Sequence, residues 1–392
     1  MTSVVILSAV RTAIGDFGGA LADATPCDLG AAVAIEAIAR AGIEPGQVGQ
    51  TVFGNVIVTA PEDMYVSRVV AMRAGVPAAS PALTLNRLCG SGLQAVVSGT
   101  EQIMLGNAET VLAGGTESMS RAGHLLTQSR RGTKMGDVAA IDMMVGVLTD
   151  PFGNGHMGIT AENIAARNGI DRTTQDAFAA ESHRRAAQAI AEGRMRDQIV
   201  PFTVYKNRSE TVVDTDEHVR ADVTADSLAA LRPAFRKDGT VTAGNSSGIN
   251  DGAAAVILMA AETAQKKNLK PLARIVSYGL GGVEPEVMGL GPIPATQHAL
   301  RKAGLAVSDL DVVESNEAFA AQACAVTAEL ELDPAKVNPN GGAVAFGHPL
   351  GASGAIILTK LVHELRRING RYGLATMCIG GGQGIAVIIE AL

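Results

Sequence analysis

Two cysteines and a histidine at glycine-rich turns are the residues of this chain whose types and positions favour chemistry. Cys89 follows a predicted strand and precedes Gly90-Ser91-Gly92, which places its sulfur at the start of a helix predicted over residues 91–105. Unpaired N–H groups and the helix dipole favour a thiolate at such a position. The competing interpretation is a small buried hydrophobe, the usual role of a free cysteine, and it is favoured for Cys27 and Cys324.

The histidine and the second cysteine lie near the carboxyl end of the chain. His348 stands between Gly347 and Pro349. An isolated histidine is more often packed or on the surface, but in this turn a base that accepts a thiol proton is the better interpretation. Cys378 precedes the run Ile-Gly-Gly-Gly-Gln-Gly at 379–384, which can bring bare backbone N–H groups against a ligand. Together with Asn316 these residues predict one site between two parts of the chain.

An internal repeat supports that prediction. Ser91-Gly92 recurs as Ser353-Gly354, and Leu112-Ala113 recurs as Leu374-Ala375, with the same offset of 262 in both cases. The strand predicted after each copy comes much later in the first copy than in the second. Residues 119 to 249 therefore form a predicted insertion, which is more charged than the rest and reads as a solvent-exposed subdomain.

Composition excludes several classes of protein. The chain has 392 residues, enough for two to three domains, and its net charge of −7 without a Lys/Arg-rich run argues against nucleic acid as a partner. The four cysteines show no metal-ligand spacing, so we predict no metal and free thiols in a reducing compartment. No signal peptide or membrane span is expected, and a cytoplasmic location follows as an expectation.

Strand and helix patterns alternate, which predicts mostly parallel sheets covered by helices. Asp28 is predicted to cap the first helix, and Gly42 to follow its end. Buried strands are expected at Val4 to Ser8, Thr51 to Phe53, Ala82 to Asn86 and Thr110 to Ala113, and helices at Asp28 to Arg40, Ser91 to Leu105 and from Thr173 or Thr174 to about Glu192, with a surface hairpin at Thr203 to Asp214.

Four blocks of the chain, in their order and spacing, resemble the signature blocks of the thiolase family. They are Leu88 to Gly92, Asn316 to Phe319, Gly347 to Pro349 and Cys378 to Gly380. The resemblance extends along the whole chain and is strongest to bacterial acetyl-CoA acetyltransferases and broad-range β-ketothiolases. It implies an α/β fold with two similar βαβαβαββ half-domains in an α/β/α/β/α arrangement. The half-domains would be residues 1–118 plus 250–270 and residues 271–392, with 119–249 as an inserted coenzyme A-binding loop domain.

The resemblance also implies an activity and the roles of five residues. The reaction would be reversible Claisen condensation of acetyl-CoA with an acyl-CoA, or thiolysis of a 3-ketoacyl-CoA, by a ping-pong mechanism. Cys89 resembles the acylated nucleophile, His348 its base and Cys378 the acid/base at the acetyl α-carbon. His348 with a water held by Asn316 would serve the enolate oxygen, and the N–H groups of Cys89 and Gly380 the tetrahedral intermediate.

By the same resemblance, coenzyme A is a substrate, no prosthetic group is used, and the subunits form a homotetramer built as a dimer of dimers. Short acyl groups are expected, and fatty acid metabolism and the supply of polyhydroxyalkanoate precursors are the implied settings. Arg220 and Ser227 would contact the nucleotide, and the pantetheine and acyl tunnel would be lined by Leu148, His156, Met157, Phe235, Ser247, Phe319 and, near the acyl end, Met288.

Other functions remain open on the residues. A degradative 3-ketoacyl-CoA thiolase would accept longer chains. A ketoacyl synthase would share the duplicated fold and the nucleophilic cysteine, but a second cysteine for proton transfer such as Cys378 favours a thiolase. A thiol-based redox enzyme would need a resolving cysteine at short spacing, which is lacking. A non-catalytic acyl-CoA binding protein of the same fold is disfavoured by the four intact blocks.

Overall fold

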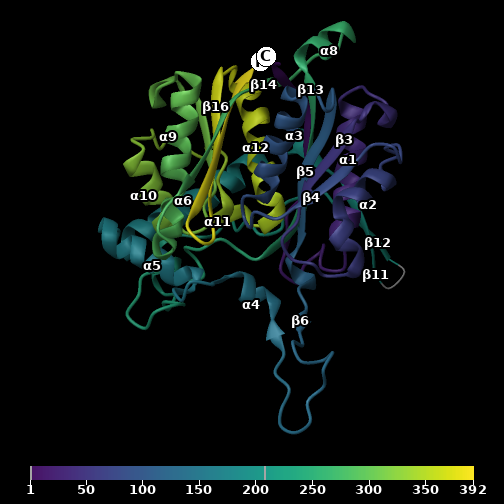
Figure 1. Cartoon of the computed structure of the whole chain (residues 1–392). Coiled ribbons are helices and arrows are strands. Elements are labelled where there is room, and N and C mark those ends of the chain that lie inside the picture. Colours follow the sequence, from purple (N-terminus) through teal and green to yellow (C-terminus); the bar gives the residue numbers. More distant parts are fainter. Residues whose placement is uncertain (1, 207–208) are drawn as a thin grey trace.

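The computed structural model describes residues 2–206 and 209–392, and its helices and strands form alternating layers (Figure 1). Within the described residues, one eleven-stranded sheet has the order β15-β16-β17-β14-β1-β13-β5-β3-β4. Two short strands lie off this path: β10 pairs with β1, and β2 pairs with β13. The strands of the first half are β1 (Val4–Thr12), β2 (Gly15–Asp16), β3 (Gln50–Gly54), β4 (Ala82–Leu85), β5 (Thr110–Ser118) and β13 (Asn250–Ala260), and those of the second half are β14 (Ala273–Gly282), β15 (Val312–Ser315), β16 (Tyr372–Ile379) and β17 (Gln383–Ala391). The two halves are joined where β1 pairs with β14.

The strand directions differ from the prediction of mostly parallel sheets. Only β3–β4, β3–β5, β15–β16 and the short β10 (Ile199–Val200) beside β1 pair in parallel, and the other strands of the sheet pair antiparallel. The reason is visible at β16 and β17, which are joined by the turn Gly380 to Gly382, and a connection that short can only join antiparallel strands. Strand β4 also differs from prediction, because it forms the edge of the sheet and is only partly buried.

Helices cover both sides of the sheet and fill the space between its halves (Figure 1). On the outer faces, α1 (Pro26–Arg40) packs on β1 and β13, while α9 (Pro292–Ala303) packs on β14 and β17. The central helices are α3 (Ser91–Met104) and α12 (Leu350–Ile368), which pack on each other. The remaining helices of the half-domains are α2 (Val66–Arg73), α8 (Ala261–Lys266), α10 (Ala320–Glu329) and α11 (Ala343–Phe346), and short 3-10 turns cover Pro45–Gln47, Pro61–Tyr65, Met119–Arg121, Arg196–Gln198, Pro285–Leu290 (η5) and Val307–Asp309.

The two central helices meet at the glycines of the sequence repeat. A Cβ added to Gly92 would lie 2.8 Å from the backbone nitrogen of Ala355, and one added to Gly354 would meet the backbone of Leu93. The first turns of α3 and α12 therefore touch through their backbones, which only residues without a side chain permit. This contact brings the residues that precede both helices, Cys89 and His348, to the same place.

Helix boundaries follow the predicted patterns with one correction. Helix α1 begins at Pro26 and is capped by Thr25, whose hydroxyl accepts the Asp28 N–H at 3.1 Å, so Asp28 lies in the first turn and is not the cap. Proline suits the first helical position because its φ is fixed and its missing N–H costs no hydrogen bond there. The helix ends before Gly42, which has a positive φ of 67°, as predicted.

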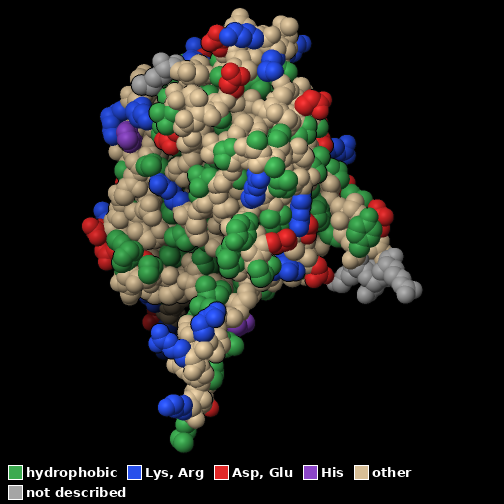
Figure 2. All heavy atoms as spheres, turned by 45° about the vertical axis from the view of Figure 1, so that its right-hand side comes forward, with side chains coloured by type: hydrophobic (Ala, Val, Ile, Leu, Met, Phe, Trp, Pro, Cys, Tyr) green, Lys and Arg blue, Asp and Glu red, His purple; other side chains and the backbone are tan. Residues whose placement is uncertain are grey.

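The segment between β5 and β13 contains a long extension that projects from the body of the molecule. It lies between β6 (His124–Leu125) and β7 (Ile141–Asp142), and Figure 2 shows Lys and Arg side chains along it. Its hydrophobic residues Leu126, Met135 and Val138 are exposed, since no other part of the described chain covers them.

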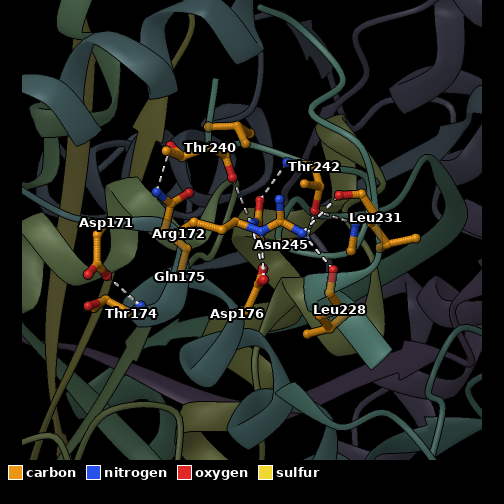
Figure 3. A network of polar contacts seen from close by, with 12 residues as sticks. Asp171, Arg172, Thr174, Gln175, Asp176, Leu228, Leu231, Thr240, Thr242 and Asn245 are labelled. Carbon is orange, nitrogen blue, oxygen red and sulfur yellow. Dashed lines mark hydrogen bonds and ion pairs between the residues drawn. The ribbon is translucent and has the colours of Figure 1, made fainter. Parts of the chain in front are cut away.

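The rest of this segment is a helical layer with its own polar network. Its elements are α4 (Met143–Val147), β8 (Thr149–Asp150), β9 (Gly155–His156), α5 (Met157–Asn168), α6 (Arg172–Ala191), β11 (Phe202–Lys206), β12 (Ser209–Val213) and α7 (Ala225–Ala229). Helix α6 and the β11–β12 hairpin confirm the sequence prediction, although the turn at 207–208 lies outside the described residues. In Figure 3, Asp176 of α6 pairs with Arg172 of the same helix at 2.6 Å and accepts a hydrogen bond from the Asn245 side chain at 2.9 Å. The second bond joins α6 to the segment that leads into β13.

Candidate active site

A cavity of about 50 Å³ between the two half-domains contains the predicted nucleophile, base and second cysteine. Cys89 precedes α3, His348 precedes α12, and Cys378 and Gly380 lie at the end of β16 and in the turn that follows it. The cavity is lined by Leu88, Cys89, Val147, Leu148, Met157, Ser247, Met288, Ala318, Phe319, His348, Leu350, Cys378 and Gly380. Residues separated by almost 300 positions are thus brought to one small, mostly apolar space.

The turn before Cys89 has an unusual backbone. Leu88 has a φ of 46°, a left-handed conformation that a leucine rarely adopts. It is held by the Asn86 side chain, which accepts the Leu88 N–H at 2.9 Å, and by Ser91, whose N–H and hydroxyl both bond the Leu88 carbonyl. The Ser91 hydroxyl also accepts the N–H of Arg87 at 2.8 Å. These bonds fix the direction in which Cys89 leaves the strand.

Burial, rather than the helix start, decides the protonation of Cys89. It raises the pKa of the Cys89 thiol to about 11, even though the backbone N–H groups of Gly380 and of Cys89 itself act in the opposite direction. The prediction that the helix start favours a resting thiolate is therefore wrong for the free protein. A base has to take the proton when the thiol reacts. The N–H groups of Gly380 and Cys89 do converge on the sulfur, as an oxyanion-binding pair must.

His348 is arranged to be that base. Its backbone N–H donates to the Asn250 side chain at 2.9 Å, and its Nδ1 lies 2.6 Å from the Ser353 hydroxyl. Because that hydroxyl donates its proton to the Pro349 carbonyl at 2.9 Å, we assign the Nδ1 proton to the bond with Ser353. The lone pair of Nε2 then faces the cavity, where Nε2 has no partner among the described residues. Burial lowers the pKa of His348 to about 4, so the ring is neutral and able to accept a proton.

Cys378 faces the same cavity from β16. Burial, reinforced by the nearby Cys89, raises the pKa of the Cys378 thiol far above its usual value. The turn after it is formed by Gly381 and Gly382, with φ values of 81° and 86° that favour glycine. The two thiols belong to different half-domains and face one space, where one can hold an acyl group while the other handles a proton.

Asn316 lies in an adjoining cavity rather than in the lining of the first. This second cavity, of about 20 Å³, also borders Glu314, Ser315, Ser353 and Lys360. Buried atoms without a partner in the described residues are Asn316 Nδ2, Glu314 Oε1 and Ser315 Oγ. A cavity of this size holds one water molecule, and buried polar groups without partners are the groups that bind one.

Most residues predicted for the pantetheine and acyl tunnel gather at the cavity. Leu148, Met157, Ser247, Met288 and Phe319 line it. His156 and Phe235 lie outside this lining, and their rings stack with 4.7 Å between the centroids. Phe235 also contacts the ring of Phe319 edge-on, with 6.2 Å between the centroids. The aromatic rings thus continue the wall of the cavity away from Cys89.

The two residues predicted to contact the nucleotide lie apart from the cavity. Arg220 and Ser227 are both exposed. The backbone N–H of Arg220 donates to His183 Nδ1 at 3.2 Å, and the Ser227 hydroxyl donates to the Thr224 carbonyl at 2.8 Å, where it completes the cap of α7. Their guanidinium and hydroxyl groups are on the surface of the inserted segment.

Comparisons with known proteins agree with this geometry. The family description "Thiolase, N-terminal domain" matches residues 4–262, and "Thiolase, C-terminal domain" matches residues 269–391. The chain belongs to the thiolase family. It is 58% identical to "Beta-ketothiolase BktB" of Cupriavidus necator, over 99% of each chain, and 51% identical to "Acetyl-CoA acetyltransferase" of Chromobacterium violaceum, also over 99% of each.

Solved structures of thiolases share its fold. Human mitochondrial 3-ketoacyl-CoA thiolase superposes with a TM-score of 0.98 at 46% identity, covering 100% of this chain and 99% of that one. Acetyl-CoA acetyltransferase of Bacillus anthracis superposes with a TM-score of 0.98 at 47% identity, with the same coverage. The predicted resemblance, the duplicated α/β fold and the assignment to the acyltransferases are confirmed.

Several residues of this thiolase site escaped sequence reasoning. Ser353 was noted only as a member of the repeat, although it orients His348. Val147 and Leu350 also line the cavity. The signal for Ser353 was its position five residues after the histidine, which is the first turn of the following helix. For the apolar residues no local signal exists, because their role depends on which segments meet.

Three further findings concern the residues that the structure describes. No group of His, Cys, Asp or Glu that could hold a metal ion is present in the described part of the chain. All four cysteines are free thiols. In the described ranges, no helix is long and apolar enough to cross a membrane.

The neutral state of His348 leads to a prediction about pH. As the pH falls through about 4, the imidazole gains a proton and stops acting as a base, whereas an ordinary histidine would do so near 6.5. We expect the rate at which acetyl-CoA acylates the protein to stay nearly level from pH 7 to 5. Stopped-flow or quenched acylation rates at these pH values measure this, and a roughly tenfold decline centred near pH 6.5 would contradict it. The unfolded chain binds this proton near pH 6.5, so the free energy of unfolding should also decrease as the pH is lowered from about 6.5 to about 4.

Proposed function

We propose that this protein is an acetyl-CoA C-acyltransferase that acts by a ping-pong mechanism through an acyl thioester on Cys89, with short acyl groups as its preferred substrates. The observation that carries the proposal is that Cys89, His348 and Cys378 border one cavity whose other residues are mostly apolar. A nucleophile, a neutral base and a second thiol are the groups that acyl transfer combined with carbon-carbon bond chemistry requires.

In the first half-reaction, His348 Nε2 takes the proton of the Cys89 thiol as the sulfur attacks the acyl carbon. The negative charge that develops on the acyl oxygen is stabilised by the N–H groups of Cys89 and Gly380, which already point at the same place. Donors fixed in advance cost no reorganisation when the charge forms. The product is a thioester on the enzyme, which keeps the acyl group reactive.

Coenzyme A leaves the first half-reaction as its thiolate and takes the proton of Cys378, while His348 keeps the Cys89 proton on Nε2. In the second half-reaction, the Cys378 thiolate removes a proton from the α-carbon of a second acetyl-CoA, and the resulting enolate attacks the acyl carbon on Cys89. The bond from that carbon to the Cys89 sulfur breaks, the 3-ketoacyl-CoA leaves, and Cys89 recovers its proton from His348. The enolate oxygen is stabilised by His348 and by a water bound at Asn316, whose buried Nδ2 and adjoining cavity support the presence of that water. Thiolysis of a 3-ketoacyl-CoA is the reverse sequence.

The small cavity supports a preference for short acyl groups. Met288 is held on η5 and Met157 at the start of α5, both buried, and with Phe319 they close the space around the two thiols. A degradative thiolase of broader chain length is the second candidate, because methionine side chains are flexible and can move to admit longer chains. Either activity would serve fatty acid metabolism or supply precursors of polyhydroxyalkanoates.

The proposal predicts where the acetyl group goes. Incubation with acetyl-CoA should add one acetyl group per chain, measured by intact mass, and peptide mapping should place it on Cys89. Steady-state thiolysis of 3-ketoacyl-CoA esters of about four to ten carbons would then distinguish the short-chain from the broad-range enzyme. Acetylation of Cys378 with Cys89 unmodified would reverse the assignment of the two cysteines.

Coenzyme A is proposed to bind across the inserted segment, residues 119–249, with its pantetheine arm along Leu148, His156, Met157, Phe235 and Ser247, and its nucleotide at Arg220 and Ser227. The polyanionic cofactor needs a cation in an acidic chain, and Arg220 is exposed in that segment. The half-domains proposed around it are residues 1–118 plus 250–270 and residues 271–392.

Arg220→Ala therefore tests the nucleotide site. The variant should raise the KM for acetyl-CoA several-fold, because it loses a charged contact that lies away from the reacting carbon. Acylation of Cys89 by a small thioester without a nucleotide should stay within about twofold of the parent rate. An unchanged KM for acetyl-CoA would show that Arg220 is only a solvated charge. Arg184, exposed on α6 and paired with Glu181, provides the matched control as Arg184→Ala.

We also propose a homotetramer, built as a dimer of dimers, and a cytoplasmic location. Support for the dimer comes from the edge strand β4, where Leu83 is exposed beside Met64 and Tyr65, two further exposed hydrophobic residues. An exposed apolar edge strand is a surface that another copy can cover. The extension between β6 and β7 supports a contact between the two dimers, because its apolar side chains are not covered by any other part of the described chain.

A further inference from the structure

Glu117 is a fully buried carboxylate at the boundary between the half-domains. It is the next-to-last residue of β5 and has 0% exposure. Its Oε1 accepts hydrogen bonds from Asn55 Nδ2 at 3.0 Å and from the Ile57 N–H at 3.1 Å. Its Oε2 accepts from the Val56 N–H at 3.1 Å and from the Gly351 N–H at 2.8 Å. All four partners are neutral donors, and both oxygens act as acceptors.

These partners come from both half-domains. Asn55, Val56 and Ile57 follow β3, whereas Gly351 is the second residue of α12 and stands three positions after His348. The contact with Gly351 is close, since a Cβ added there would lie 2.8 Å from Glu117 Oε2 and 3.0 Å from the Asn55 Cα. A carboxylate at the first turn of a helix is favoured by the free N–H groups and the helix dipole. Glu117 thus ties the start of the helix behind His348 to the half-domain that carries Cys89.

The second copy of the repeat shows that the fold itself does not need a carboxylate here. The offset of 262 places Ile379 at the position of Glu117. Ile379 lies against Gly90 at the start of α3, whereas Glu117 contacts Gly351 at the start of α12. The offset pairs Gly90 with Ala352, one residue after Gly351, so the two contacts are similar but not identical. An apolar side chain is sufficient at one of them, and the four hydrogen bonds of a carboxyl group are specific to the other.

The four donors act on the carboxyl group itself. Burial raises the pKa of Glu117 to about 8, and the Asp251 carboxylate adds to this, while the N–H groups of Ile57, Gly351 and Val56 lower it. Because all four partners donate, both oxygens of Glu117 are held as acceptors.

We propose that Glu117 is a positioning residue, which holds the start of α12 in the register that aligns His348 with Cys89. This rests on the proposed roles of Cys89 and His348. Gly351 follows His348 by three residues, and Asn55 to Ile57 belong to the half-domain that carries Cys89, so the carboxyl group joins the two turns.

Glu117→Gln tests the proposal with little change of shape. The amide removes the charge, and its NH₂ group faces N–H donors, so one side of the clamp is lost. We expect the kcat for thiolysis to fall by at least about tenfold, with the KM for coenzyme A substrates within twofold, because coenzyme A binds elsewhere. Acylation of Cys89 by acetyl-CoA, measured by quenched reaction and intact mass, should slow by a similar factor. A general loss of packing would raise the KM as well.

Glu364→Gln is the matched control. Glu364 is a buried carboxylate on the same helix, paired with Asn340 and Arg367, and lies about 20 Å along α12 from Gly351. Its variant should keep the parent kcat and acylation rate. A parent-like kcat in folded Glu117→Gln would overturn the proposal.

If Glu117→Gln does not fold, Glu117→Asp tests the positioning role in its place. Its side chain is one methylene too short to reach both groups of donors, so the kcat should fall while the KM for coenzyme A substrates stays within twofold. A parent-like kcat in Glu117→Asp would overturn the positioning role. Failure of the proposed function is seen separately, because the parent protein would then not acylate Cys89.

Discussion

Cys378→Ala should still accept an acetyl group from acetyl-CoA on Cys89 but lose the formation and cleavage of carbon-carbon bonds. The nucleophile, its base and the two N–H donors at Cys89 and Gly380 remain in place, so the first half-reaction keeps its machinery. The variant removes the thiol that is proposed to transfer the proton at the α-carbon. General acid–base groups contribute about 10²- to 10⁴-fold, and a loss of that size in thiolysis turnover is expected.

Intact mass measures the acetylated fraction of this variant, and absorbance of the 3-ketoacyl thioester measures turnover. Cys324→Ala is the matched control, because Cys324 is a partly buried free thiol on α10 and does not border the cavity. An equal loss of acylation and turnover in Cys378→Ala would show that Cys378 only supports the structure of the site.

The repeat explains how much of the site the sequence could predict. Ser91-Gly92 and Ser353-Gly354 mark two helices of one kind, and a duplicated unit places its equivalent turns near each other. The structure agrees, because α3 and α12 cross at those glycines and Cys89 and His348 precede them. The residues proposed to do chemistry stand out in the sequence because they interrupt a pattern of small and apolar residues at turns.

Properties that depend on long-range packing could not be predicted. The direction of β13 depends on where the chain re-enters the sheet after an insertion, and nothing local encodes it. The helix start suggested a low pKa for Cys89, but burial by the opposite half-domain raises it. Glu117 illustrates the limit, since its contact with Gly351 spans 234 positions. A glutamate at the end of an apolar strand carries no sign of which helix it will meet.

His348→Ala should differ from Cys378→Ala by losing both half-reactions. In the proposed mechanism, His348 takes the thiol proton in the first and stabilises the enolate oxygen in the second, so acylation of Cys89 and overall turnover should both fall by about 10²-fold or more. Quenched acylation with acetyl-CoA followed by intact mass measures the first, and steady-state thiolysis the second. His363→Ala is the matched control, because His363 lies on α12, the helix that begins just after His348, and bonds the Ala9 carbonyl outside the cavity.

Ser353→Ala tests whether the tautomer of His348 matters while the imidazole ring itself remains. The ring stays, but Nδ1 loses the hydroxyl that holds its proton and fixes Nε2 as the acceptor. Acylation should then fall by about tenfold, the effect of about 1.4 kcal/mol for one lost hydrogen bond, and remain far above that of His348→Ala. Acylation of His348→Ala at the parent rate would transfer the role of base to another group. Acylation of Ser353→Ala as slow as that of His348→Ala would mean that the ring acts only in the tautomer that Ser353 selects.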